Sequence, residues 1–558
     1  MRQLVLISGR MCTGKSDLGR LLRDEFGYHL VRTSDILRKL AKRRGHKLAS
    51  LQKLGAQMDV KTRGRWVLNE VRKAAKQLPS SKPIVVDNIH TAVQLEHFRS
   101  AHSWLTIHAH LYAPRDELER RFKDKMKKRR RSGMSSARYL DADHLKDQRD
   151  ILGFKHDAEV RINTARTDAR DTLVRVASRL GLYSPPDVRC VDVLVGGQYG
   201  SEGKGHIAAY LARDYDVLVR VGGPNAGHTV SSASGVYTYH QLPSGARDTK
   251  ARLLLGPGMT INVKRLLEEI KECRVKPDRL FIDPQAMIIE KEDIKAERGL
   301  VAKIASTGQG SGAAAARRIL GRKPHAVRLA RDIQALRPYV GVKPHYRGRT
   351  LDQLELAYRR GQSILLEGTQ GSGLSIFHGH YPYVTSRDTN VAGCLAEVGI
   401  SPNRVRRILM VVRPTPIRVG NPDGDKKLTS GWLKHETTFV TIATAAGLDP
   451  TEVPQNERTS TTKRPRRVGW FDWDQFRRAC ALNAPTDIVL TFADYISVKN
   501  QKARRFEQLT EDTIKFVEEL ERIAQSPVSL INTRFPRKPE EKIDLRTVID
   551  RRNWMARK

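Results

Sequence analysis

The chain has 558 residues, of which 100 are lysine or arginine and 61 are aspartate or glutamate, giving a formal net charge of +39. Its length allows two or three hydrophobic cores, and the absence of any run of 18 apolar residues excludes a membrane-spanning helix. The five cysteines have no metal-ligand spacing and no secretory signal pattern is present, so we expect a reduced, cytoplasmic protein.

The first predicted elements are a strand, a glycine-rich loop and a helix. The apolar run at 4–8 leads into Gly-Arg-Met-Cys-Thr-Gly-Lys-Ser at 9–16, the phosphate-binding loop motif in its usual setting. A buried strand at 83–86 then ends at Asp87, which we expect to support a magnesium ion or to receive a substrate group. The residues expected to hold phosphate and Mg²⁺ in the loop are Gly9, Gly14, Lys15 and Ser16.

Three further segments of this region resemble nucleoside monophosphate kinases. The segment 33–38, with Asp35, is similar to their acceptor side; 118–131, rich in lysine and arginine, is similar to their lids; and 158–164 is similar to their final strand. The resemblance implies phosphoryl transfer to a nucleotide, and a domain that binds ATP only for regulation is the alternative. Prolines at 185 and 186 follow a helix pattern, which predicts a linker after a domain at 1–183.

The second domain, predicted at 188–558, opens with another strand, glycine-rich turn and helix. An apolar run at 191–195 is followed by Gly-Ser-Glu-Gly-Lys-Gly at 200–205 and by a helix pattern at 206–213. Such a turn presents backbone N–H groups to anionic oxygens, and the lysine adds a positive charge. Taken alone, this pattern predicts a nucleotide or phosphate site.

Five later segments extend this pattern. They are Gly-Gly-Pro-Asn-Ala-Gly-His-Thr at 222–229, Leu-Pro-Ser-Gly at 242–245, Glu-Gly-Thr-Gln-Gly at 367–371, Tyr-Pro-Tyr-Val-Thr-Ser at 381–386 and Thr-Thr-Lys-Arg-Pro-Arg-Arg at 461–467. In this order the series closely resembles the adenylosuccinate synthetases, which phosphorylate O6 of a purine nucleotide and then join aspartate to C6. The strand and helix patterns predict an α/β protein of two domains, each a largely parallel sheet flanked by helices.

The resemblance implies a role for each matched residue. Lys204 would hold a triphosphate, His228 would donate a proton or hydrogen bond as charge builds on O6, and Gln370 would contact the purine. The other implied nucleotide-binding residues are Gly200, Glu202, Gly203, Gly205, Asn225, Thr307, Arg328, Thr385, Arg418 and Asp494. The implied aspartate- and sugar-binding residues are Thr461, Thr462, Arg464 and Arg466. The carbonyl of Gly227 would bind Mg²⁺, and Arg328 would act only in a homodimer, the assembly that the resemblance implies.

Two positions depart from the family pattern. Ser201 stands where the family has an aspartate that takes the N1 proton and helps to hold Mg²⁺; a serine is a weaker base and metal ligand, but it leaves room for an extra amino group. Phe492 replaces the lysine that, with the retained Asp494, recognises the guanine of GTP. With both changes the sequence resembles the phage-type 2-aminoadenylosuccinate synthases. These enzymes condense dGMP with L-aspartate, use ATP or dATP as the phosphoryl donor, and supply the synthesis of 2-aminoadenine DNA. Such a bacteriophage enzyme would act in the host cytoplasm.

Several alternatives stay open at this point. These motifs are also compatible with three other proteins: an ordinary adenylosuccinate synthetase that uses IMP, an inactive relative, and a protein that binds nucleotides or nucleic acid without turnover. Water, Glu202 or the substrate itself could take the N1 proton. Basic clefts for anionic substrates account for the net charge, so we expect at most weak, non-specific binding to nucleic acid.

Overall fold

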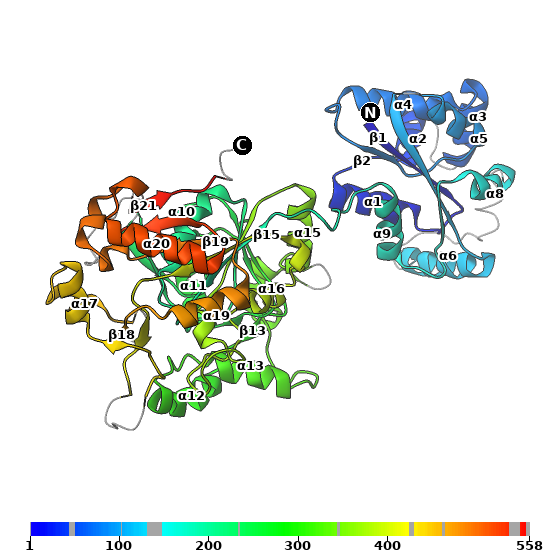
Figure 1. Ribbon diagram of the computed structural model, residues 1–558. Coiled ribbons are helices and arrows are strands. Elements are labelled where there is room, and N and C mark those ends of the chain that lie inside the picture. The colour runs from blue at the N-terminus through cyan, green and yellow to red at the C-terminus, as the bar shows by residue number, and fades with distance from the viewer. Residues whose placement is uncertain are drawn as a thin grey trace. The chain divides into compact units, whose positions relative to one another are not determined.

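The computed structural model describes residues 2–43, 51–101, 103–130, 148–232, 235–342, 346–422, 429–459, 464–534 and 547–553. The chain divides into two compact units, Met1–Tyr183 and Ser184–Lys558 (Figure 1). Within the described ranges, no helix combines the length and the apolar character needed to cross a membrane.

The first unit is a five-stranded parallel sheet with strand order β2-β3-β1-β4-β5. Its strands are β1 (Arg2–Gly9), β2 (His29–Val31), β3 (Ile84–Val86), β4 (Trp104–Tyr112) and β5 (Val160–Asn163). The described helices are α1 (Lys15–Phe26), α2 (Thr33–Arg43), α3 (Leu51–Thr62), α4 (Arg65–Lys76), α5 (Ala92–Arg99), α6 (Arg115–Arg130), α8 (Gln148–Asp157) and α9 (Ala169–Arg179). The lid-like pattern thus lies on α6, which begins three residues before the segment predicted from the sequence; the 131 end of that segment lies outside the described residues.

The alternation of side chains along β1 builds the two faces of this sheet. Leu4 and Leu6 pack in one apolar cluster with residues of α2, α4 and α5, whereas Val5 and Ile7 pack in another with residues of α1 and α9. Successive side chains of a strand point to opposite faces, so a continuously apolar strand serves two helical layers. Figure 1 shows these helices on both sides of the sheet.

The second unit contains a nine-stranded sheet with strand order β12-β10-β7-β14-β6-β15-β19-β20-β21. Its strands are β6 (Val191–Gly196), β7 (Val217–Arg220), β10 (Arg252–Leu255), β12 (Leu280–Ile282), β14 (Ile364–Glu367), β15 (Val405–Val412), β19 (Asp487–Leu490), β20 (Val528–Asn532) and β21 (Val548–Asp550). All pairs are parallel except the edge pair of β20 and β21. The α/β fold predicted from the sequence is therefore confirmed in both units.

Helices cover both faces of the larger sheet. Residues of α10 (Lys204–Leu211) and α11 (Val263–Glu272) pack in one apolar cluster, and those of α15 (Thr350–Arg359), α16 (Val391–Val398), α19 (Trp473–Asn483) and α20 (Glu511–Ala524) in another. The remaining described helices are α12 (Lys291–Ile304), α13 (Ser311–Leu320), α14 (Arg337–Val340), α17 (Phe439–Ala446) and α18 (Glu452–Asn456). The small strands are β8 (His228–Ser232), β9 (Gly235–Tyr239), β11 (Thr260–Ile261), β13 (Met287–Ile288), β16 (Ile417–Val419), β17 (Glu436–Thr437) and β18 (Arg466–Gly469).

The carboxyl ends of the central strands place charged residues at one edge of this sheet. Arg220 ends β7, Glu367 ends β14, and Arg413 directly follows β15, while the glycine-rich loop follows β6 between them. Ligands of open parallel sheets bind in the crevice outside these strand ends. The strand order therefore brings together motifs that are far apart in the sequence.

Candidate active site

The glycine-rich loop after β6 is organised around the carboxylate of Glu202. Its Oε1 accepts from the backbone N–H groups of Gln198 (3.0 Å) and Gly200 (2.7 Å), and its Oε2 lies 2.7 Å from Nζ of Lys204. Both charged side chains are buried. Since every oxygen of this carboxylate is engaged in holding the loop, Glu202 is a poor candidate to take a proton from a substrate.

Two glycines of this loop are required by its geometry. Gly203, the residue before α10, has φ 84°, a left-handed conformation that other residues adopt only with strain. A Cβ atom on Gly205 would lie 2.5 Å from Cβ of His228. The missing side chain of Gly205 thus allows His228 to pack directly against the first turn of α10.

His228 belongs to a buried polar cluster with three other residues. Its Nδ1 lies 2.5 Å from Oε1 of Glu367, the same oxygen accepts from Nη1 of Arg220 (2.7 Å), and the Ser244 N–H donates to Oε2 (2.8 Å). The Ser244 hydroxyl also donates to this carboxylate. Nη1 of Arg220 lies nearer to Oε1 of Glu367 (2.7 Å) than to Nδ1 of His228 (2.9 Å), so its hydrogen bond is assigned to the carboxylate. Because a carboxylate only accepts hydrogen bonds, the shorter contact between Nδ1 and Oε1 assigns the imidazole proton to Nδ1 and leaves Nε2 with a lone pair.

The electrostatics of this cluster keep the histidine neutral and the glutamate ionised. Burial, together with the charge of Arg220, lowers the pKa of His228 to about 4. Burial opposes ionisation of Glu367, but Arg220 and His228 outweigh it and hold the pKa of that carboxyl at about 2. The cluster therefore presents a neutral imidazole whose pKa rises when further negative charge arrives beside it.

A cavity of about 210 Å³ lies next to this cluster. It brings together the sequence-predicted residues Gly200, Ser201, Asn225, Gly227, His228, Thr307, Gln370, Thr385, Arg418 and Arg466. Several of its buried polar atoms have no hydrogen-bond partner among the described residues, namely Nε2 of His228, Oε1 of Gln370, Oδ1 of Asn225, Nη1 of Arg418 and Nε of Arg466. Unpartnered buried groups of this kind are rare unless a ligand satisfies them.

Two arginines supply positive charge to this cavity. Arg418 donates to the carbonyls of Ser430 (Nη2, 2.7 Å) and Tyr383 (Nη2, 2.9 Å), and its guanidinium lies over the ring of Tyr199 at 4.4 Å. Burial lowers its pKa, yet a guanidinium stays charged at neutral pH. Arg466 donates from Nη1 to Oε2 of Glu457 (2.7 Å). The free N–H group of each arginine suits a phosphate or carboxylate.

Other sequence-predicted residues do not line this cavity. Asp494 is buried and accepts from Gln501 (3.1 Å), and Arg328 is largely exposed and pairs with Glu290 (2.6 Å). The remaining members of this group are Glu202, Gly203, Lys204, Gly205 and Arg464. Thr461 and Thr462 lie outside the described residues.

Several residues that organise the site are not among the site residues predicted from the sequence. They are Arg220, Ser244, Glu367, Arg413 and Glu457, all buried. Arg220 and Glu367 each end an otherwise apolar strand, and a charged residue at the carboxyl end of a parallel strand is the signal that could have identified them.

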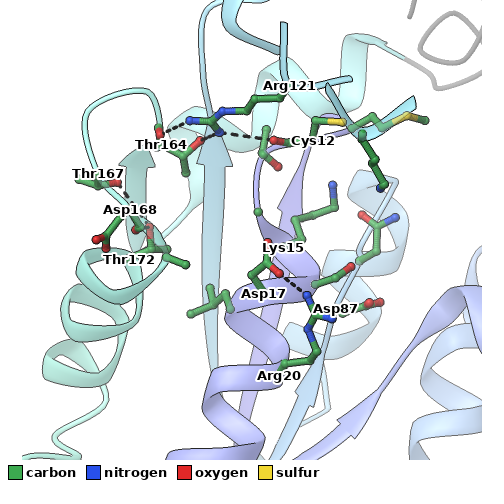
Figure 2. Close-up of a pocket in the computed structure, with 18 of the residues that line it drawn as sticks. Cys12, Lys15, Asp17, Arg20, Asp87, Arg121, Thr164, Thr167, Asp168 and Thr172 are labelled. Atoms are coloured by element: carbon green, nitrogen blue, oxygen red, sulfur yellow. Dashed lines mark hydrogen bonds and ion pairs between the residues drawn. The ribbon is translucent and has the colours of Figure 1, made fainter. Parts of the chain in front are cut away.

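The first unit has its own cavity, of about 590 Å³, around the phosphate-binding loop. Gly14 precedes α1 with φ 91°, and Nζ of Lys15 donates to the carbonyls of Gly9 (2.8 Å) and Arg10 (2.7 Å). Asp87, at the end of β3, lines the same cavity, and burial raises its pKa. Figure 2 shows Lys15 and Asp87 together in this pocket.

Arg121 and Thr164 also line this pocket. From α6, Arg121 donates to Oγ1 of Thr164 (3.0 Å) and to the carbonyl of Cys12 (3.4 Å), as Figure 2 shows. The predicted site residue Asp35 does not line the cavity, because it is exposed and pairs with Arg38 (2.8 Å) one turn along α2.

Magnesium fits the oxygen donors at both cavities. Among the described residues no group of three or more His, Cys, Asp or Glu side chains could hold a metal ion. Gly227 and Ser201 line the larger unit's cavity, and Ser16 lines the other. Such sparse oxygen donors suit Mg²⁺, which usually completes its shell with substrate phosphates and water.

Comparison with known proteins assigns the larger unit. The adenylosuccinate synthetase family model matches residues 193–334 and 315–501, and an AAA domain model matches residues 5–141. The chain is 35% identical over 378 residues to the adenylosuccinate synthetase of Pyrococcus horikoshii, covering 65% of this chain and 98% of the relative. It is 34% identical over 359 residues to that of Methanocaldococcus jannaschii, covering 61% and 93%.

Two solved structures resemble the same part of the chain. The succinoaminodeoxyadenylate synthetase (PurZ) of cyanophage S-2L, bound to dGMP and to dATP as an energy donor, has a TM-score of 0.52 and 28% identity over 65% of this chain and 95% of that protein. The fully ligated adenylosuccinate synthetase of Plasmodium falciparum, at 22% identity, has a TM-score of 0.53 over 65% and 100%, which shows the shared fold. The chain is thus a C–N bond-forming ligase that belongs to the adenylosuccinate synthetase family, and it carries before this part a P-loop domain that matches an AAA domain model.

Proposed function

We propose that the larger unit joins L-aspartate to C6 of dGMP with ATP or dATP as phosphoryl donor, forming 2-amino-2'-deoxyadenylosuccinate for 2-aminoadenine DNA. The observation that carries the proposal is Ser201, which lines the cavity where the family has an aspartate. A carboxylate would accept the single N1–H of hypoxanthine but would crowd a 2-amino group. A small, neutral hydroxyl accommodates that group and accepts a hydrogen bond from it.

The unpartnered atoms of the cavity support a guanine base. Oε1 of Gln370, Oδ1 of Asn225 and Nε2 of His228 are all acceptors without a partner. Guanine offers three N–H hydrogens on its N1 and 2-amino groups, whereas hypoxanthine offers only its N1–H there. A site with several buried acceptors favours the ligand that satisfies more of them.

An adenine nucleotide as donor is supported by two observations. The first is that Phe492 replaces the guanine-recognising lysine. The PurZ of cyanophage S-2L, 28% identical to this chain, is bound to dGMP and to dATP as an energy donor. Together these favour ATP or dATP over GTP.

The buried histidine supplies the proton transfer that Ser201 cannot. As O6 attacks the γ-phosphorus, the N1 proton passes to the free Nε2 of His228, and Glu367 stabilises the imidazolium through Nδ1–H. When the neutral aspartate amine displaces phosphate from C6, the imidazolium returns this proton to the leaving phosphate, and the proton that the attacking amine loses passes to solvent. Bound Mg²⁺ would neutralise charge on the triphosphate, held by Gly227, Ser201 and phosphate oxygens.

The test is phosphate release by the full chain with aspartate, Mg²⁺ and ATP. Reactions with dGMP, GMP and IMP are run in parallel, and the nucleotide product is identified by mass. A succinyl adduct of dGMP with little from IMP is expected. Turnover of IMP alone would instead make the protein an ordinary adenylosuccinate synthetase, and binding without phosphate release from any of the three would indicate a binding protein.

For the first unit we propose phosphoryl transfer from ATP to a nucleoside monophosphate. The cavity supports this because it combines the phosphate-binding loop with the carboxylate of Asp87 and the cationic side chains of Arg121 and Lys125. Transfer between phosphates needs charge neutralisation around the moving group, which these cations supply. Radiolabel transfer from ATP to each nucleoside monophosphate in turn is the direct assay.

A further inference from the structure

Arg413 is fully buried and ties the glycine-rich loop to the sheet. Its Nη1 donates to the carbonyl of Ser201 (3.4 Å), and its backbone N–H donates to Oε1 of Gln198 (3.1 Å). The Gln198 side chain in turn donates to the carbonyl of Arg413 (3.0 Å). The main chain at Ser201 is thus supported by the residue that directly follows the adjacent strand β15.

The other end of the same guanidinium reaches a glutamate between two arginines. Nη2 of Arg413 donates to Oε1 of Glu457 (3.1 Å), which also accepts from the hydroxyl of Tyr495 (2.7 Å). Oε2 of Glu457 accepts from Nη1 of Arg466 (2.7 Å). Burial opposes ionisation of Glu457, but the two arginines outweigh it and hold the pKa of the carboxyl at about 2. An ionised Glu457 therefore orients Arg466, whose Nε has no partner among the described residues.

Aromatic rings cover the guanidinium of Arg413. Its Cζ lies 4.0 Å from the ring centre of Phe492 and 5.2 Å from that of Tyr495, and the two rings meet edge to face at 5.4 Å. Phe492 holds this place with φ 54°, in the left-handed region. A ring face attracts a cation and excludes water from it, whereas a lysine at 492 would place a second cation there.

We propose that Arg413 is a positioning residue that couples Ser201, in the purine pocket, to the aspartate-binding Arg466 through Glu457, and that Phe492 serves as the cover of Arg413. The proposal rests on the proposed function of the larger unit for the choice of base at Ser201 and for the use of aspartate, which the family resemblance assigns to Arg466. The guanidinium of Arg413 would then position both the loop that carries Ser201 and, through Glu457, the side chain of Arg466. The ring of Phe492 then acts on catalysis through Arg413, in addition to the effect on the donor that follows from the missing lysine.

Steady-state kinetics of the full chain test this coupling with whichever purine nucleotide is turned over. Glu457→Gln should raise the KM for aspartate roughly tenfold or more, because a neutral amide holds Arg466 less firmly than a carboxylate does. The KM for the purine nucleotide should stay within about twofold, because Arg413 keeps its hydrogen bonds to Ser201 and Gln198. Arg413→Lys should raise the KM for aspartate and also change the ratio of kcat/KM between dGMP and IMP. Phe492→Leu should change the same two quantities as Arg413→Lys, but by a smaller factor. Phe492→Tyr, which keeps an aromatic ring over Arg413, should retain the wild-type values.

The matched control is Arg406→Lys. Arg406, on β15, makes a bidentate ion pair with Asp192, on β6, at 2.9 and 2.6 Å. This control should leave both KM values unchanged. An unchanged KM for aspartate in Glu457→Gln, or Arg413→Lys that lowers kcat alone, would overturn the proposal.

Calorimetric titration with L-aspartate in the presence of nucleotides gives the same comparison if the wild type binds without turnover. The coupling can therefore be measured even if the protein shows no ligase activity. Equal aspartate affinities in the wild type and in Glu457→Gln would refute the coupling between Glu457 and Arg466. If Arg413→Lys does not fold, Glu457→Gln and Phe492→Leu decide the question.

Discussion

Nδ1 of His228 lies 2.5 Å from Oε1 of Glu367, although 139 positions separate the two residues in the chain. His228 begins β8 and Glu367 ends β14, so this contact joins two of the motifs found in the sequence. The carboxylate determines the imidazole tautomer and so decides which nitrogen faces the cavity. The proposed proton transfer depends on this pair.

Replacing Glu367 by glutamine should lower kcat by roughly 10²- to 10⁴-fold, because the neutral amide no longer stabilises the imidazolium or selects the tautomer. The KM for the purine nucleotide should change much less. Steady-state kinetics check this, and urea unfolding shows whether the unpaired Arg220 has disturbed the fold. Ser244→Ala, which removes one hydrogen bond to the same carboxylate, should have a smaller effect on kcat; equal losses in both variants would argue against the tautomer role.

Replacing Ser201 by aspartate should shift preference from dGMP toward IMP. The carboxylate would accept the N1 proton of IMP and crowd the 2-amino group of dGMP. The ratio of kcat/KM values for the two nucleotides, measured for wild type and variant, reports this directly. Ser201→Ala is the companion variant, since it removes the hydroxyl without adding charge, and unchanged dGMP selectivity in Ser201→Asp would show that another residue chooses the base.

The first unit should lose stability as pH falls from about 6.5 toward 4. Burial lowers the pKa of His108 to about 3 and that of His110 to about 4, and both hydrogen-bond the Ser8 hydroxyl (2.7 and 2.9 Å). The unfolded chain binds more protons in this window, so the free energy of unfolding is largest above pH 6.5 and decreases below it, by about 2 kcal/mol per histidine at pH 5.

Urea unfolding of the full chain at pH 7 and pH 5 measures this dependence. His108→Gln should reduce the difference between the two pH values by about 2 kcal/mol, even if it lowers stability at both. The control is His97→Gln on α5, because Nε2 of His97 is on the surface and contacts the carbonyl of Arg63. A His108→Gln variant with the full wild-type difference would exclude this histidine as the source.

Replacing Lys15 by alanine should abolish phosphoryl transfer by the first unit and leave the ligation of aspartate by the larger unit intact. Lys15 is the loop lysine whose Nζ is positioned over the carbonyls of the phosphate-binding loop, and the two units are separate compact bodies. Both reactions are assayed on the same preparation, with the surface variant Lys73→Ala as control. A joint loss of both activities would mean that the two reactions are coupled.

The local motifs were predictable because each consists of residues adjacent in the chain that together form one strand, turn and helix. The glycine-rich turns at 9–16 and 200–205 follow apolar strands and open helices, and both lie at strand ends as the pattern requires. Most of the residues assigned by resemblance line one cavity. Asp494 does not line it, and Asp35 does not line the cavity of the first unit, because these carboxylates bond to Gln501 and Arg38 respectively.

The sequence by itself determined the two-unit α/β organisation, the family and the phosphate-binding loops, since these depend on hydrophobic pattern and on residues adjacent in the chain. Only the tertiary structure decided which buried charges meet. The strand order β7-β14-β6-β15 brings Arg220 to Glu367 and places Arg413 beside the loop that carries Ser201. Such pairs are set by which strands become neighbours, and a buried charge takes the partner that the packed sheet places within reach.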